Sequence, residues 1–400
     1  MMSAERLTLD ASELAGDYQL RTRLIHGPGV LSQLGELARS LGARRALLVT
    51  DPGIVAAGHA GRGHAYLENA GLDVLLFAGA RENPTTADVE RGVESAAGFA
   101  PDLIVGLGGG SSMDCAKGIN FILTNGGQMR DYWGVDKATR PMLPLIAVPT
   151  TSGTGSEMQS FALISDAETH VKIACGVKNT CAKIAVLDPE LTVTQPPSVT
   201  ALTGIDALSH AIETFVSTKK TLLSRMYSRE AFRLLSHSFE MVLQEPTNLS
   251  ARSAMQMGAC LAGMAIESSM LGAAHALANP LTAKFGTAHG QAVGLMLPHV
   301  VRYNAEQFEP EYQLLMQSFA APQRRRASEH PNKPSGSAEL ADWLVSVLRL
   351  AGLATELRGL HVTADHVSDL AAAAAPQWTG TFNPRKVDAE VLGRLYHRAL

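Results

Sequence analysis

The sequence predicts an α/β domain followed by an all-α domain. In the first half, short apolar runs rich in Val, Ile and Leu alternate with longer segments of helical periodicity, a pattern typical of a parallel sheet with crossover helices. The runs are apolar at nearly every position, as strands covered on both faces require. After Pro196 and Pro197 such runs become rare, and apolar residues recur at helical spacing. We therefore divide the chain into domains at residues 1–197 and 198–400.

The individual elements follow from the same patterns. The predicted strands are residues 46–50, 74–77, 103–107, 145–148 and 184–187. We take the Pro-Pro pair as the joint between the domains, and we expect Thr200 or Thr203 to cap a helix that holds residues 205–216. Apolar residues at helical spacing follow at Tyr227, Ala231, Leu234, Leu235, Phe239 and Val242. Residues 322–336, with three consecutive arginines, are expected to form a surface loop, with a docking site as the alternative.

Composition and charge disfavour several classes of function. Apolar residues make up 46% of the 400 residues and charged residues 18%, which is ordinary for a globular protein. Basic residues number 34 against 38 acidic ones, so the chain lacks the charge pattern of a nucleic-acid or anionic-membrane binder. No apolar run approaches the length of a membrane span, and no signal peptide is evident. Four cysteines without Cys-x-x-Cys spacing indicate neither disulfides nor a thiolate zinc site. We expect a cytoplasmic protein.

A glycine-rich turn follows the predicted strand at residues 103–107. The segment reads GGGSSMD, residues 108–114, and continues into a helical pattern. Glycines let the main chain approach a phosphate, and the free N–H groups at a helix N-terminus attract its charge. Gly108, Gly109 and Gly110, together with the hydroxyl of Ser111, are therefore the expected pyrophosphate site of a dinucleotide. A tight turn without a ligand would show the same pattern.

Two further strand ends carry polar groups. Asp51 ends an earlier strand at the carboxyl edge, where open α/β sheets bind ligands. Its carboxylate would hold a ribose hydroxyl and repel a 2′-phosphate, so we expect NAD(H) to be preferred over NADP(H); alternatively, Asp51 only starts a turn with the following Pro-Gly. The loop VPTTSGTGSE, residues 148–157, offers the hydroxyls of Thr150, Thr151 and Thr154 to adenine or ribose, unless these hydroxyls bond their own main chain.

Residues of metal-ligating type lie in the second half. Asp206 and His210 stand one helical turn apart and so share a face. His275 and His289 follow in two different elements, which we expect Pro280 to separate by breaking the helix. One carboxylate with three imidazoles suits Zn(II), Fe(II), Co(II) or Ni(II), and we expect iron or zinc.

Two nearby residues have other expected roles. Glu213 lies on the same helical face as Asp206 and is an alternative carboxylate ligand, but we favour it as an acceptor that orients one of the imidazoles. His299 lies in an apolar run, and we expect it to be a structural or pocket-wall histidine.

Taken in order, five motifs resemble the iron-containing, or group III, alcohol dehydrogenase family. They are GGGSSMDCAKG, PTTSGTGSE, GIDALSHAIE, HALANPL and the segment at His289-Gly290, and NPRK at residues 383–386 resembles the closing segment of the family. The resemblance runs from about residue 18 to residue 400. It implies an N-terminal dinucleotide-binding domain with a Rossmann-like parallel sheet, an all-helical metal-binding domain, and a catalytic cleft between them, as in the dehydroquinate synthase-like fold.

Matched position by position, the resemblance implies roles for named residues. The metal ligands fall on Asp206, His210, His275 and His289, and the pyrophosphate loop falls on Gly108, Gly109, Gly110 and Ser111. Adenine and ribose contacts fall on Asp51, Thr150, Thr154 and Lys172, with Val199 packing on the base. The implied activity is reversible hydride transfer between a primary or short-chain alcohol and NAD(H), with Fe(II) or Zn(II) as Lewis acid. The implied assembly is a homodimer or a larger homo-oligomer.

One position departs from the family pattern. Many members have a further histidine four residues after the third ligand, where this chain has Asn279. An amide can hydrogen-bond a substrate or cofactor, but it cannot exchange a proton near neutral pH as an imidazole does. We therefore expect water or ribose hydroxyls to carry the proton.

Two other functions stay open at this point. A metal- and NAD-dependent lyase of the dehydroquinate synthase type would need basic residues to grip a phosphorylated sugar acid, and the candidates are Arg130, Lys172 and Lys178. A non-catalytic NAD-binding structural protein would form no NADH with any alcohol. The motifs favour the dehydrogenase.

Overall fold

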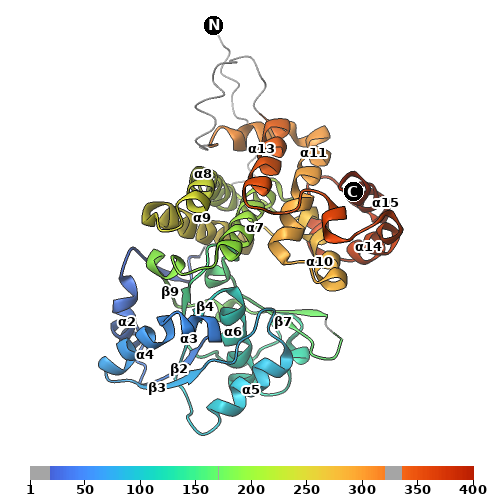
Figure 1. The fold of residues 1–400 in the computed structure, drawn as a ribbon. Helices are drawn as coiled ribbons and strands as arrows, with labels where there is room; N and C mark the ends of the chain where they lie inside the picture. The colour runs from blue at the N-terminus through green and yellow to red at the C-terminus, as the bar shows by residue number, and fades with distance from the viewer. Residues whose placement is uncertain (1–18, 170, 320–335) are drawn as a thin grey trace.

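The computed structural model describes residues 19–169, 171–319 and 336–400. Figure 1 shows an α/β half, coloured blue to green, next to a helical half, coloured yellow to red. This is the architecture that the sequence predicts. The predicted surface loop at residues 322–336 lies outside the described residues except for Gly336, which precedes a helix.

A six-stranded parallel sheet forms the centre of the first half. Its spatial order is β1-β9-β6-β4-β2-β3. The strands are β1 (Arg23–His26), β2 (Arg45–Val49), β3 (Asp73–Phe77), β4 (Leu103–Gly108), β6 (Leu145–Pro149) and β9 (Ile184–Leu187). All the predicted strands are present, with ends that differ by at most one residue. The edge strand β1 was not predicted, because its four residues mix charged and apolar types and none is fully buried.

Both faces of this sheet are covered by helices, as the apolar runs predicted. Leu47 and Ile104 point into one apolar cluster, whereas their neighbours Leu48 and Val105 point into the cluster on the other face. The helices of this half are α2 (Leu34–Ser40), α3 (Pro52–Ala56), α4 (His59–Asn69), α5 (Thr86–Ala96) and α6 (Gly110–Asn125). A small second sheet has the order β5-β8-β7 and was not predicted. Its strands are β5 (Gly134–Val135), β7 (Phe161–Ser165) and β8 (Lys172–Gly176).

The strand order reverses between β2 and β4. From β2 the chain moves outward to the edge strand β3, and it then returns to place β4 on the other side of β2. In open α/β sheets, the carboxyl ends of the strands at such a reversal flank the ligand crevice. In this protein those ends lead into Asp51, after β2, and into the glycine-rich turn, after β4.

The second half is helical. Its helices are α7 (Pro197–Val216), α8 (Leu222–Gln244), α9 (Leu249–Ser268), α10 (Ala273–Phe285), α11 (His289–Met316), α13 (Ser337–Leu350), α14 (Val367–Ala374) and α15 (Ala389–Arg398). Helix α7 is buried along most of its length and packs against α8, α9 and α11. No single helix of the described residues is long and apolar enough to cross a membrane, and one bent pair, α9 with α10, meets that test only in combination.

Two local predictions in this half are wrong. Helix α7 begins at Pro197, so Thr200 and Thr203 lie inside it and cap nothing; the Thr203 hydroxyl donates to the Val199 carbonyl at 2.8 Å. Proline is favoured at the first helical position, since its fixed φ suits a helix and its missing N–H would be unpaired there. Pro280 does not break its helix but lies inside α10, which ends at Phe285 and is capped by Gly286 with φ of 63°.

Candidate active site

Three helices bring together the four residues predicted as metal ligands. Asp206 and His210 lie one turn apart on α7, His275 lies in the first turn of α10, and His289 is the first residue of α11. The Asp206 Oδ1 atom lies 3.4 Å from His210 Nε2, 3.6 Å from His275 Nε2 and 3.8 Å from His289 Nε2. Asp206, His210 and His275 are buried, and His289 is partly exposed. The exposed side of the cluster is therefore the side of His289.

This donor set fits a single divalent ion. A tetrahedral ion with bonds of about 2.0–2.3 Å holds its ligand atoms about 3.3–3.8 Å apart, which matches the spacings around Asp206. Asp206 Oδ1 and His275 Nε2 are buried and have no hydrogen-bond partner among the described residues. Buried polar atoms are nearly always hydrogen-bonded. Several buried polar atoms that face one another without hydrogen-bond partners therefore indicate a ligand site. Asp206, His210 and His275 each offer a ligand atom within 4.8 Å of the others.

Glu213 contacts the cluster through His275, on the side of the ring away from Asp206. One carboxylate oxygen accepts from His275 Nδ1 at 2.5 Å, and the other accepts from the Ala274 N–H at 2.7 Å. Burial opposes a charged imidazole at His275, but Glu213 and Asp206 outweigh burial and raise the pKa of His275 to about 9. Glu213 holds the Nδ1 proton, so His275 presents Nε2 toward Asp206, and a bound metal ion would replace the proton that this raised pKa keeps on Nε2. A carboxylate that orients a ligating histidine in this way is common in metal sites, and it is the role that we expected for Glu213.

The other ionisable groups of the cluster favour the ligating protonation states. Burial alone would raise the pKa of Asp206, but His210, His275 and His289 together hold it well below its usual range. Burial lowers the pKa of His289 to about 3, with the nearby cations adding to the effect and Asp206 opposing it. A carboxylate and neutral imidazoles are the forms that bind a metal ion.

The glycine-rich turn has the geometry of a phosphate cradle. Helix α6 begins directly after it, and no side chain caps the N-terminus of this helix, which leaves main-chain N–H groups free for an anion. Gly108 has φ of +152°, which side-chain-bearing residues rarely adopt, and a Cβ on Gly110 would lie 2.7 Å from the Thr154 side chain. Glycine is therefore required at both positions.

Asp51 lies beside this turn and is already hydrogen-bonded. Its Oδ1 accepts from the Ile54 N–H at 3.1 Å and caps α3, so the turn-starting role considered for it is present. Its Oδ2 accepts from the Ser112 hydroxyl, in the first turn of α6, at 2.8 Å. The ribose contact of Asp51 stays a prediction, and the structure adds that its carboxylate links the start of α3 to the first turn of α6.

The loop after β6 joins the cofactor edge to the metal cluster. Thr150 donates its N–H to the Gly108 carbonyl at 2.9 Å, and Thr154 packs on Gly110. The Thr154 hydroxyl also accepts from the Ser156 N–H at 3.3 Å, which is the local bond considered as its alternative. A Cβ on Gly153 would lie 2.6 Å from the Thr203 Cβ on α7, one turn before Asp206. This loop therefore contacts both predicted binding regions.

The remaining predicted residues lie nearby in different settings. Thr151 flanks Gly109, and Val199 is half-buried in the first turn of α7. Lys172 begins β8 and is exposed, and Asp114 on α6 and Asp206 on α7 are near enough to favour its charged form. The Asn279 amide donates to the Gln377 side chain at 2.9 Å.

Among the basic candidates for a lyase, Arg130 pairs with Asp166 at 3.0 Å and with Glu168 at 3.3 Å.

The sequence analysis missed a buried lysine in this region. Lys117 on α6 is fully buried, and its ammonium group donates to the carbonyls of Ser156, Gln159 and Phe161 at 2.7–2.9 Å. It therefore fixes the far end of the loop that contains Thr150 and Thr154. A lysine three residues after Asp114, on the helix face turned toward the sheet, was the available signal.

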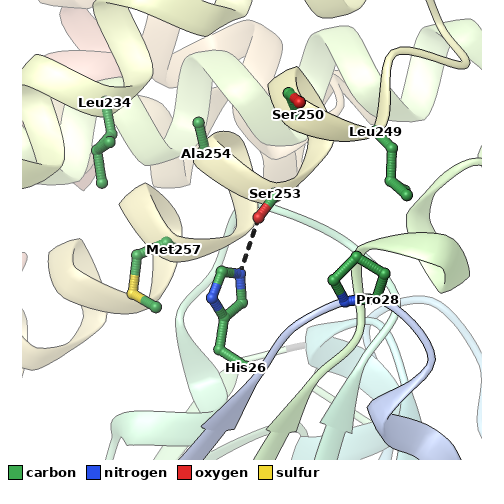
Figure 2. A pocket seen from close by; sticks show the side chains of 8 residues that line it. All are labelled: His26, Pro28, Leu234, Leu249, Ser250, Ser253, Ala254 and Met257. Atoms are coloured by element: carbon green, nitrogen blue, oxygen red, sulfur yellow. Dashed lines mark hydrogen bonds between the residues drawn. The ribbon is translucent and has the colours of Figure 1, made fainter.

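A cavity of about 480 Å³ lies away from this site. Figure 2 shows it between the end of β1 and helices α8 and α9, with the His26 ring facing Ser253 at 3.1 Å. Its lining is mostly apolar: His26, Pro28, Leu234, Leu249, Ser250, Ser253, Ala254 and Met257. None of the predicted site residues lines it, so its presence does not affect the assignment above.

Comparisons with known proteins agree with this geometry. Residues 21–189 match the family model for iron-containing alcohol dehydrogenase, and residues 200–400 match the C-terminal model of the Fe-containing alcohol dehydrogenase family. A 1,3-propanediol dehydrogenase of Klebsiella pneumoniae is 31% identical over 392 residues, which cover 96% of this chain and 98% of the relative.

Two solved structures are closely similar in fold. A 1,3-propanediol oxidoreductase has a TM-score of 0.90 and 30% identity over 96% of this chain and 100% of its own. A sulfoacetaldehyde reductase from Bifidobacterium kashiwanohense, solved with NAD+, has a TM-score of 0.86 and 27% identity over 96% of this chain and 99% of its own. The chain therefore belongs to the iron-containing alcohol dehydrogenase family, and its class of activity is that of an NAD-dependent alcohol dehydrogenase.

Proposed function

We propose that this enzyme interconverts a small primary alcohol and its aldehyde with NAD(H), using one iron ion held by Asp206, His210, His275 and His289. The observation that carries the proposal is the convergence of a buried carboxylate and three imidazoles at ligand spacing, next to a loop that also contacts the glycine-rich turn. The family favours iron, while the donor set also suits zinc.

When bound, the metal ion supplies Lewis acidity toward the substrate oxygen, and NAD+ supplies the hydride acceptor. The residues of this chain hold and orient these groups. Glu213 retains the proton on His275 Nδ1 and so keeps Nε2 available as a ligand atom. Asn279 uses its amide N–H to bind Gln377, and its side-chain oxygen is an acceptor only. Because that amide does not titrate, the proton released by the alcohol leaves through water or ribose hydroxyls.

We assign the dinucleotide site to the turn at Gly108, Gly109, Gly110 and Ser111. The uncapped N-terminus of α6 would face the pyrophosphate, and Asp51 beside it favours a free ribose 2′-hydroxyl over a phosphate. We further assign the adenine and ribose contacts to Thr150, Thr151, Thr154, Lys172 and Val199, and the contacts of Thr151 with Gly109 and of Thr154 with Gly110 support this assignment.

The named relatives act on different substrates, so the substrate of this enzyme is proposed only by class. A diol and a sulfonated aldehyde appear in their names. We propose a neutral primary or short-chain alcohol. We further propose a cytoplasmic enzyme, since its four cysteines are free, and an assembly of two or more copies, which light scattering on the purified protein would test.

The experiment is an alcohol panel with metal analysis. Protein purified without oxygen is assayed for NADH formation with NAD+ and primary alcohols of increasing length, and its bound iron and zinc are measured in the same sample. We expect about one iron per chain, activity that a chelator removes and Fe(II) restores, and preference for NAD+. Absence of NADH across the panel from iron-loaded protein would refute the proposal and favour a non-catalytic NAD-binding role.

A further inference from the structure

The loop after β6 is held from the helical half by a hydrogen-bond network that the functional assignment above does not use. Gln195, in the connection between β9 and α7, donates its side-chain N–H to the Thr150 carbonyl. The Thr150 N–H in turn donates to the Gly108 carbonyl at 2.9 Å. A continuous path of bonds therefore runs from the glycine-rich turn through Thr150 to Gln195.

Arg252 determines which way the Gln195 amide points. The Gln195 side-chain oxygen accepts from the Arg252 guanidinium at 3.3 Å and from the Thr200 hydroxyl at 3.1 Å. With its oxygen bound by these two donors, the amide must present its N–H group to Thr150. Arg252 also donates to the Thr200 hydroxyl at 2.9 Å, and Thr200 lies on α7 before the ligands Asp206 and His210.

Arg252 is an unusual residue for this position. It is 2% exposed, and burial alone lowers its pKa, because no carboxylate of the described residues offsets the effect. A buried charge without a counter-charge is unfavourable unless neutral acceptors satisfy it. The acceptors here are the Pro246 carbonyl at 2.8 Å, Thr200 and Gln195. The guanidinium group therefore joins the segment before α9, the first turn of α7 and the connection between β9 and α7.

One turn further along α9, Gln256 extends the same contact. Its amide N–H groups reach the Pro149 carbonyl at 3.1 Å and the Asp188 carbonyl at 3.4 Å, at the ends of β6 and β9. Residues four apart share a helix face, so α9 turns Arg252 and Gln256 toward the strand ends. Ser253 and Met257, one position further along, line the cavity of Figure 2 instead.

We propose that Arg252 and Gln195 are positioning residues of the cofactor cleft. Through their hydrogen bonds they hold the end of β6 against the glycine-rich turn, and they fix the position of this strand end relative to the metal-bearing helix α7. The proposal rests on the proposed NAD(H) site. The network touches only main-chain carbonyls on the cofactor side, so it acts on the placement of Thr150, Thr151 and Gly108 rather than on substrate. Its loss should therefore weaken NAD+ binding much more than alcohol binding.

The test compares Arg252→Met and Gln195→Leu with the exposed control Arg233→Met. Dissociation constants for NAD+ are measured by calorimetry, and KM for NAD+, KM for the alcohol and bound iron are measured on the same preparations. We expect about a tenfold rise in KM and Kd for NAD+ in either variant, as for loss of a charge-assisted hydrogen bond. We expect the KM for the alcohol and the iron content to stay within about twofold of wild type, and the control to match wild type.

Two further variants keep the proposal falsifiable if Arg252→Met does not fold. Arg252→Lys retains the charge, but its single nitrogen cannot bind the Pro246 carbonyl and the Thr200–Gln195 pair at once, as two nitrogens of the guanidinium do. Its NAD+ affinity should therefore fall between those of wild type and Gln195→Leu. The double variant Arg252→Lys with Gln195→Leu should be no weaker than Gln195→Leu alone, because both act through one bond to Thr150.

The failing outcomes are distinct. Unchanged NAD+ affinity in folded Gln195→Leu, or an equal rise in both KM values, overturns the proposal while leaving the dehydrogenase function standing. A wild-type enzyme that neither binds NAD+ nor forms NADH overturns the function and this proposal together.

Discussion

The metal cluster and the dinucleotide edge are built in opposite ways. The cluster consists of side chains on three helices, and its atoms converge on a point within a buried region. The dinucleotide edge consists mainly of main chain: glycines in a turn, an uncapped helix end and loop carbonyls held by distant side chains. Removing one ligand should therefore abolish the metal site, whereas removing one contact at the dinucleotide edge should only shift an affinity.

The largest effect is expected from the cluster. Asp206→Ala removes the only carboxylate among the four converging residues and leaves the three imidazoles without it. We expect bound iron to fall below about a tenth of the wild-type level and turnover to fall more than about a thousandfold. Elemental analysis and initial rates check both, with Asp342→Ala, at an exposed ion pair with Arg302, as control. Full iron content with normal turnover would remove Asp206 from the metal site.

A smaller effect on metal binding is expected from Glu213, which contacts the ligand His275 but does not itself face the proposed ion. Glu213→Gln keeps an acceptor for His275 Nδ1 but loses the charge that favours the oriented imidazole. We expect iron affinity to fall about 10- to 100-fold, as for other carboxylates behind ligating histidines. Competition with a chelator measures this change. Glu240→Gln, at a buried carboxylate bonded to Trp343 in the same half, is the matched control and should bind iron normally.

A buried carboxylate on the dinucleotide side should behave differently from those of the cluster. Burial raises the pKa of Glu157 to about 7, and Lys117 offsets only part of this shift. A carboxyl group with a raised folded-state pKa binds more protons when folded, so its stabilising effect is full below the unfolded-state pKa and is lost as pH rises toward 7. Glu157→Gln should therefore gain about 3 kcal/mol over wild type at pH 8 and little at pH 4.5.

Chemical unfolding at the two pH values measures this difference. Glu36→Gln, at an exposed position of α2, should show no pH-dependent change. Equal stability of wild type and Glu157→Gln at pH 8 would mean that Glu157 is not buried in its charged form.

The smallest effect is expected at Asp51. Asp51→Asn keeps an oxygen to accept from the Ile54 N–H and an NH2 group that can donate to the Ser112 hydroxyl, but it removes the charge that would repel a 2′-phosphate. We expect the ratio of kcat/KM for NAD+ to that for NADP+ to fall about tenfold, and further in Asp51→Gly, which also loses the contact to Ser112. An unaltered ratio in both variants would leave Asp51 as a helix cap only.

Much of this protein could be predicted because the signals are local. The predicted strands appear where apolar runs do, and Asp206 and His210 share a face because they are four residues apart. Thr200, Thr203 and Pro280 were misjudged because a proline at the first position of α7 and the packing around α10 outweighed the local preference. Strands β1 and β5 escaped prediction because short strands gain their order from neighbours that are distant in sequence, here β9 and β8.

Sequence by itself determined the elements, the types of chemical group and their order along the chain, since periodicity and turn chemistry act over a few residues. Tertiary structure decided what those groups meet: His289 beside Asp206, Lys117 beneath the loop after β6, and Arg252 behind Gln195. The physical reason is that a ligand cage or a buried cation is stable only when partners from remote segments surround it at hydrogen-bonding distance. No short-range sequence pattern predicts those contacts.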